Sequence, residues 1–204
     1  YASRIFEKAG MGDRWIYYDK HSDRWKGSNR PGMLGKIREA DLLINLSCSN
    51  VLRPWAMQIP NRIVIDTDPL FTQVRNLEDP KRFELVANHT AFFTYGENMG
   101  QPDCSIPDDG FAWEPTRQPI VLDRWPVIKG NKEGNYTTVM KWDSYPAKQF
   151  RGITYGMKSH SFTPFISLPM STASVMELAV SDSSAPKQCL RSYGWIISDA
   201  MRAA

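Results

Sequence analysis

Two aspartates, Asp66 and Asp68, lie within three residues of the end of a short run of β-branched residues at 63–65. This run is too short for a helix and is flanked by prolines and polar residues, which predicts a buried strand. In open α/β sheets, ligands bind outside the carboxyl ends of the strands. A carboxylate at that place can accept a proton from a substrate as a general base. Either aspartate could instead cap the following helix, and the residue pattern alone does not choose between these roles.

Polar side chains also follow two further predicted strands. The segment 41–48 is apolar for most of its length, as expected for a parallel strand covered on both faces, and it ends in small polar residues. The aromatic segment 91–95 is followed by Glu97, the next candidate base, and Asn98. Because parallel strands end at one edge of a sheet, we expect these side chains to gather there. The residues expected at or just beyond this edge are Ser47, Asp66, Asp68, Gln73, Glu97 and Asn98.

Two basic residues are candidates for binding a phosphate or carboxylate group. Arg117 lies beside Thr116 in a proline-stiffened segment, 113–119, between two α/β runs. An arginine there can hold such a group through two parallel hydrogen bonds. Lys158 follows a strand predicted from Thr137 and can reach a phosphate as a point charge. The alternatives are an arginine that satisfies loop carbonyls and a lysine that is merely solvated.

Strand patterns alternate with helical patterns along the chain, which is typical of a doubly wound α/β sheet. The segments expected to be helical are 2–9, 33–40, 80–88 and 186–193. A polar stretch at 19–32 is expected to be a loop. Five prolines between 101 and 135 predict an extended crossover, in which Phe111, Trp113, Val121, Leu122 and Trp125 need burial. A second α/β run starts at Tyr136, with strands expected at 137–142, 175–180 and 195–198.

Composition indicates a globular protein and excludes several functions. The 204 residues are 42% hydrophobic and carry a net charge of +3 with basic and acidic residues intermixed, which predicts no nucleic-acid partner. The three cysteines form no CxxC pair, so neither a disulfide framework nor a metal site is expected and a cytoplasmic location fits. No apolar run is long enough to span a membrane. His89 is expected at the start of a strand, away from the ligand edge, and is not a candidate base.

Five segments together resemble a bacterial family of glycosyltransferases with the GT-B fold. They are 62–73 (RIVIDTDPLFTQ), 89–100 (HTAFFTYGENMG), 113–125 (WEPTRQPIVLDRW), 136–142 (YTTVMKW) and 155–162 (YGMKSHSF). Their order and spacing match as well, and the resemblance covers nearly the whole chain. GT-B enzymes have two Rossmann-like domains that face each other across a cleft, one for the acceptor and one for the nucleotide sugar.

The resemblance implies how the chain is divided. Residues 1–125 would form an amino-terminal, acceptor-side Rossmann-like domain without its first strand, 126–135 a crossover, and 136–204 the start of a donor-side domain. Family members begin earlier and continue further, so we expect an internal fragment whose second α/β unit is incomplete. We expect this chain alone to be inactive as a transferase. Exposed strand edges in such a fragment predict self-association, and hence a possible homo-oligomer.

The resemblance also implies a function. A sugar would pass from a nucleotide-sugar substrate to an unknown acceptor, with no further cofactor and no metal. Asp66, Asp68 and Glu97 would be candidates for the base, while Gln73, Asn98, Thr116, Arg117 and Lys158 would line the cleft. The alternatives are a non-catalytic α/β module that binds a sugar or nucleotide, and an enzyme resembling nucleotide-sugar epimerases on the same fold.

Overall fold

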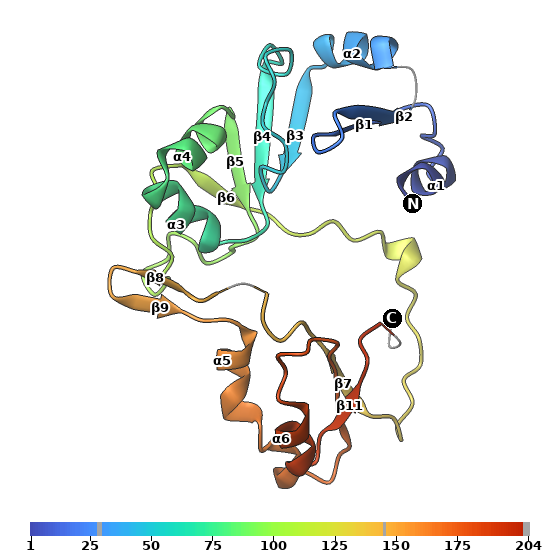
Figure 1. The fold of residues 1–204 in the computed structure, drawn as a ribbon, viewed down its shortest axis with the longest axis vertical. Coiled ribbons are helices and arrows are strands. Elements are labelled where there is room, and N and C mark those ends of the chain that lie inside the picture. The colour runs from blue at the N-terminus through green and yellow to red at the C-terminus, as the bar shows by residue number, and fades with distance from the viewer. Residues whose placement is uncertain (28–29, 145, 202–204) are drawn as a thin grey trace. The chain divides into compact units, whose positions relative to one another are not determined.

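The computed structural model describes residues 1–27, 30–144 and 146–201, and the chain forms two compact units, Tyr1–Pro119 and Ile120–Ala204 (Figure 1). The division falls at Pro119, ahead of the crossover expected at 126–135. Both units contain a parallel sheet and helices, so the expected mixed α/β class is confirmed.

The first unit is built on four parallel strands in the order β3 (Leu42–Leu46), β4 (Asn61–Asp66), β5 (Ala91–Thr94) and β6 (Trp113–Pro115). The expected strands at 41–48, 63–65 and 91–95 are confirmed. All four strands run in the same direction, so their carboxyl ends share one edge of the sheet. β6 was expected to be part of the crossover, and instead it forms the outer edge beside β5.

Two helices, α3 (Phe71–Glu78) and α4 (Pro80–Ala87), lie side by side against the sheet (Figure 1). Asp79 caps α4 by accepting a hydrogen bond from the Lys81 backbone N–H at 2.9 Å, and Pro80 occupies the first helical position. The side chain of Asn76 donates to buried Asp109 at 2.7 Å, and the indole of Trp113 donates to the same carboxylate at 2.9 Å. Asp109 therefore ties α3 to β6.

The chain before β3 forms helix α1 (Ala2–Lys8), an antiparallel hairpin of β1 (Ile16–Asp19) and β2 (Arg24–Gly27), and helix α2 (Arg30–Arg38). The loop expected at 19–32 is therefore wrong for β2 and for the start of α2, while residues 28–29 lie outside the described part. Strand pairing overrides the polar composition because the rings of Trp25 and Tyr18 pack across the hairpin at 5.1 Å.

One face of β3 is open to solvent. Leu42, Ile44 and Leu46 are 47%, 59% and 50% exposed, whereas Asn45 between them is buried. Alternate side chains of a strand point to opposite faces, so these three leucine and isoleucine side chains share one exposed face, and the expectation that this strand is covered on both faces is wrong.

The second unit has three parallel strands, β7 (Tyr136–Val139), β10 (Met176–Ala179) and β11 (Ile196–Ser198), in the order β11-β10-β7. Its helices are α5 (Lys158–Phe162) and α6 (Lys187–Ser192), and β8 (Lys148–Phe150) pairs with β9 (Ile153–Tyr155) in a hairpin. Short 3-10 turns cover Leu122–Arg124, Thr163–Phe165 and Leu168–Ser171.

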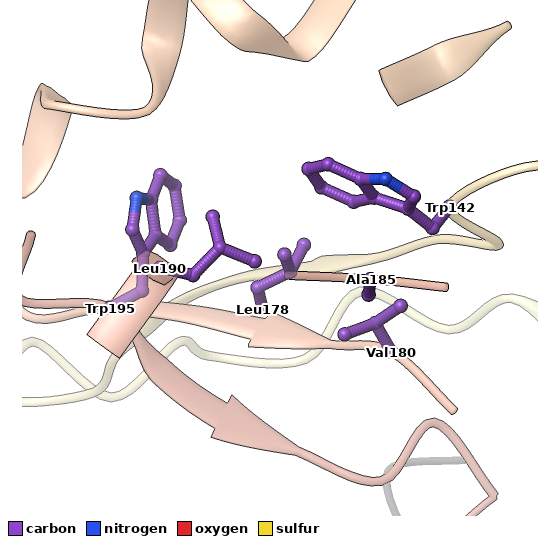
Figure 2. Close-up of a cluster of buried hydrophobic side chains, with 6 residues drawn as sticks. All are labelled: Trp142, Leu178, Val180, Ala185, Leu190 and Trp195. Carbon is purple, nitrogen blue, oxygen red and sulfur yellow. The ribbon is translucent and has the colours of Figure 1, made fainter. Parts of the chain in front are cut away.

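Leu178 and Leu190 lie at the centre of a hydrophobic cluster in this second unit, flanked by Trp142 and Trp195 (Figure 2). The indole of Trp195 also donates a hydrogen bond to the Ile166 carbonyl at 2.7 Å. Strands expected at 175–180 and 195–198 and the helix at 186–193 are confirmed. The strand expected at 137–142 ends at Val139, and Trp142 packs into the core instead.

The start of the second unit is not packed as the sequence predicted. Val121, Leu122 and Trp125 are exposed, so the expectation that they need burial is wrong. This stretch runs mostly without regular structure apart from the turn at Leu122–Arg124, and its apolar side chains are not collected on one covered face.

Candidate functional site

Backbone hydrogen bonds draw the ends of the four parallel strands together. The backbone N–H of Ser47 donates to the Ile65 carbonyl at 2.8 Å, and that of Tyr95 donates to the Asp66 carbonyl at 3.0 Å. Beyond β6, the N–H of Thr116 donates to the Thr94 carbonyl at 2.8 Å. The segments that carry Ser47, Asp66, Asp68, Glu97, Asn98, Thr116 and Arg117 therefore leave the sheet at one edge, which we call the carboxyl edge.

Asp66 is the buried centre of this edge. Its side chain is among the least exposed in the chain, at 1%. Oδ1 accepts from the Asp68 backbone N–H at 3.0 Å and the Thr72 hydroxyl at 2.7 Å. Oδ2 accepts from Gln73 Nε2 at 3.1 Å and the Thr94 hydroxyl at 3.0 Å. Asp66 thus connects β4, β5 and α3.

Gln73 completes this network from the helix side. Its amide oxygen accepts from the Leu70 backbone N–H at 2.7 Å while its amide nitrogen donates to Asp66, and the residue is fully buried. Leu70, which precedes the helix, has a φ of +78°, a left-handed conformation that is costly for a leucine. Neither aspartate is the N-cap residue of α3; Asp66 instead holds the first turn through side chains. Gln73 accordingly has a positioning role here.

Asp68 is the carboxylate of the pair that reaches solvent. Its side chain is 38% exposed, and its Oδ2 lies 3.8 Å from Nη2 of Arg75, one turn along α3. The backbone N–H of Asp68 is held by Asp66, so the buried aspartate fixes the position of the exposed one. This geometry suits a base that meets a ligand at the carboxyl edge.

Glu97 and Arg117 form an ion pair between the loops after β5 and β6. Nε of Arg117 contacts Oε1 of Glu97, and Nη2 donates to Oε2 at 3.3 Å, so the contact is bidentate. The hydrogen bond and the positive charge of Arg117 lower the pKa of Glu97. A carboxylate with a lowered pKa is a weaker proton acceptor, which favours Glu97 as an orienting group. Asn98 is exposed in the same loop.

A pocket opens between the end of β3 and the two helices. It has about 400 Å³ of empty space, part of it open to solvent. The polar residues that line it, apart from Asp66, are Ser47, Cys48, Thr72, Arg75, Asn76 and Arg82. Burial raises the pKa of the Cys48 thiol to about 11, so the thiol is neutral near pH 7; Asp66 also raises this pKa and Arg82 lowers it.

Sequence reasoning did not find this pocket. Arg75 lies in α3, four residues before Asp79, and Arg82 lies in α4, three residues after it. Nothing in the sequence around either arginine indicates a binding residue. The available signal was helical spacing, because Thr72, Arg75 and Asn76 follow an i, i+3, i+4 pattern that places them on one face. No helix is predicted at 71–78, so the sequence alone does not place these three residues on one face.

Lys158 belongs to the second unit, whereas the other seven predicted site residues belong to the first. It is exposed at the start of the short helix α5. Its neighbours Ser159 and His160 line an open hollow with about 910 Å³ of empty space, next to Asp143. The hydroxyl of Ser159 donates to Asp143 Oδ1 at 2.6 Å, which fixes this side of the hollow.

His89 is buried at the end of β5 opposite the carboxyl edge. Its Nδ1 lies 3.0 Å from the Val86 carbonyl and its Nε2 lies 3.1 Å from Asn45 Nδ2. Because a carbonyl only accepts and an amide nitrogen only donates, the imidazole is neutral with its proton on Nδ1. Burial lowers the pKa of His89. Its role is to join β3, α4 and β5.

Across the described ranges, no three or more His, Cys, Asp or Glu side chains form a group that could hold a metal ion. The helices of residues 1–27, 30–144 and 146–201 include none with the length and apolar character needed to cross a bilayer. Comparisons of the chain with models of protein families, with curated proteins and with solved structures each return no match.

Proposed function

We propose that this chain belongs to a glycosyltransferase that uses a nucleotide sugar, with the first unit on the acceptor side and the second on the donor side of a GT-B arrangement. The observation that carries the proposal is Asp68, a partly exposed carboxylate held at the carboxyl edge of a parallel sheet. Ligands of such sheets bind at that edge. The resemblance of five segments to GT-B glycosyltransferases supports the same assignment.

The proposed reaction is a displacement at the anomeric carbon of the sugar. The acceptor oxygen forms a bond to this carbon, the bond from carbon to the diphosphate oxygen breaks, and the acceptor proton passes to Asp68. The nucleoside diphosphate leaves with the bonding electrons. Arg117 and Lys158 supply positive charge for phosphate groups, while Glu97, Asn98 and Thr116 orient the sugar or acceptor.

A second candidate is a non-catalytic module that binds a sugar or nucleotide. It is favoured by the engagement of all three predicted carboxylates: Asp66 accepts four hydrogen bonds, Asp68 lies near Arg75, and Glu97 pairs with Arg117. Such internal contacts suit a site that holds a ligand without moving protons. Nucleotide-sugar binding that an acceptor strengthens or weakens would favour the transferase, and binding that no acceptor alters would favour the module.

The proposal is tested by calorimetric titration of the chain with uridine, guanosine and thymidine diphosphates and their sugars. We expect saturable binding that weakens in Arg117→Ala and in Lys158→Ala. Two matched controls, Arg38→Ala in the first unit and Lys132→Ala in the second, remove the same charges at exposed positions outside the predicted site and should leave binding unchanged. Absence of saturable binding at millimolar ligand, or equal losses in the controls, would contradict the proposal.

A further inference from the structure

We propose that the pocket between the end of β3 and helices α3 and α4 is a binding site for a phosphate group, held by the guanidinium groups of Arg75 and Arg82. Phosphate binding in this pocket does not require the proposed transferase reaction, because it depends neither on Asp68 as a base nor on Lys158. It would take inorganic phosphate or a phosphate monoester carried by a larger ligand.

The two arginines line one pocket from two different helices. Thr72, Arg75 and Asn76 are spaced at i, i+3 and i+4 on α3, and all three line the pocket. Arg82 lines it from α4. Guanidinium groups present planar, forked N–H donors that match phosphate oxygens, so two of them at one pocket favour a doubly charged anion.

The guanidinium of Arg82 is available to a ligand. Within the described residues it makes no ion pair or side-chain hydrogen bond, and its positive charge is felt inside the pocket, where it lowers the pKa of the Cys48 thiol. Nη2 of Arg75 lies 3.8 Å from Oδ2 of Asp68, which is longer than a good charge-assisted hydrogen bond, so a phosphate oxygen would compete with Asp68 for this guanidinium.

The remaining lining groups do not oppose an anion. The single carboxylate at the pocket, Asp66, directs both of its oxygens to four internal donors. With Cys48 neutral, the residues that line the pocket carry two positive charges and one negative charge, while Asp68, near Arg75, is not part of the lining. The backbone at Ser47 and Cys48 is also unusual, because both have left-handed φ angles of +56° and +49°. Such strained residues cluster at ligand sites.

The experiment is a titration of the chain with inorganic phosphate at constant ionic strength, followed by calorimetry and by amide chemical shifts. We expect saturable binding with a dissociation constant on the order of 1 mM, because two charge-assisted contacts are gained. Shifts should be confined to Ser47 and Cys48 and to the pocket faces of α3 and α4. Acetate should bind much more weakly, and equal binding of acetate would overturn the assignment to phosphate.

Arg82→Gln and its neighbour Lys81→Gln form a matched pair. Both remove one positive charge from an exposed position of α4, but only Arg82 lines the pocket. We expect Arg82→Gln to weaken phosphate binding at least about tenfold and Lys81→Gln to have little effect. Arg82→Lys should weaken phosphate binding less, because the positive charge remains and only the forked N–H donors of the guanidinium are lost. Equal losses in the matched pair, or no saturable phosphate binding by the original chain, would overturn the proposal.

Failure of the phosphate proposal can be distinguished from failure of the transferase proposal. Nucleotide-sugar binding that depends on Arg117 and Lys158 but not on Arg82 would support the transferase site alone. Phosphate binding that depends on Arg82 but not on Arg117 would support the pocket alone.

Discussion

Replacement of Asp66 by asparagine should destabilise the first unit strongly, although the two side chains have nearly the same shape. Each carboxylate oxygen of Asp66 accepts one hydroxyl, which can turn, and one N–H, which cannot: the Asp68 backbone N–H on Oδ1 and Gln73 Nε2 on Oδ2. Gln73 cannot flip, because its amide oxygen already accepts from Leu70. Whichever way the asparagine amide turns, one buried N–H faces another donor.

The expected cost follows from these contacts. One hydrogen bond to a charged acceptor is lost, about 1.5–3 kcal/mol, and one buried donor is left without a partner, about 1–3 kcal/mol. The sum is roughly 2.5–6 kcal/mol, a large part of the 5–15 kcal/mol of a typical domain. Asp68→Asn makes the same chemical change two residues away at a partly exposed ion pair and should cost about 1 kcal/mol or less.

Urea unfolding measures both variants, and hydrogen exchange of the amides in β4 and α3 reports the first unit by itself. We expect Asp66→Asn to lower the free energy of opening for both elements, while Asp68→Asn leaves it nearly unchanged. If the two variants unfold within about 1 kcal/mol of each other, the hydrogen bonds assigned to Asp66 do not hold the sheet to α3 as argued.

Three further predictions concern other parts of the first unit. Because burial lowers the pKa of His89, its contribution to stability is present above the ordinary value of about 6.5 and is lost as pH falls through the lower folded value; urea unfolding between pH 7 and 5 should show a loss that His89→Gln removes. Alkylation mapped by mass spectrometry at pH 8 should modify exposed Cys189 well before Cys48, whose pKa is raised to about 11, and equal rates would contradict the burial of that thiol. The uncovered face of β3 should make the chain self-associate at high concentration, and Ile44→Lys should reduce the mass measured by light scattering. A monomeric original chain would count against that last prediction.

Short strands are predictable where their residues are β-branched or aromatic and their ends are marked by turn residues. This held for β4 and β5, whose cores are Ile63–Ile65 and Phe92–Phe93. It failed for β6, because Trp113-Glu114-Pro115 is short and contains a proline, which a sheet tolerates only at an edge or a strand end. Pairing with β5 determines this strand, and that partner is remote in sequence.

The carboxyl edge was predictable from the sequence, but the contacts within it were not. The positions of Asp66 and Glu97 after successive strands were sufficient to place both at one edge. The burial of Asp66 depends on Thr94, 28 residues away, and on α3, whose start requires Leu70 in a left-handed conformation. Such a conformation is rare for leucine, so no local propensity indicates a helix beginning there.

Asp66 and Asp68 illustrate how two carboxylates that lie two residues apart at the end of one strand can differ in what they are able to do. A carboxylate offers about four lone-pair positions, and Asp66 uses four for internal donors. It could accept a substrate proton only by giving up one of these contacts, which would loosen α3. The Asp68 side chain is 38% exposed, and its backbone N–H is held in place by Asp66. In the proposed reaction, proton transfer at this edge therefore falls to Asp68, and the buried aspartate would act only by holding the position of its neighbour.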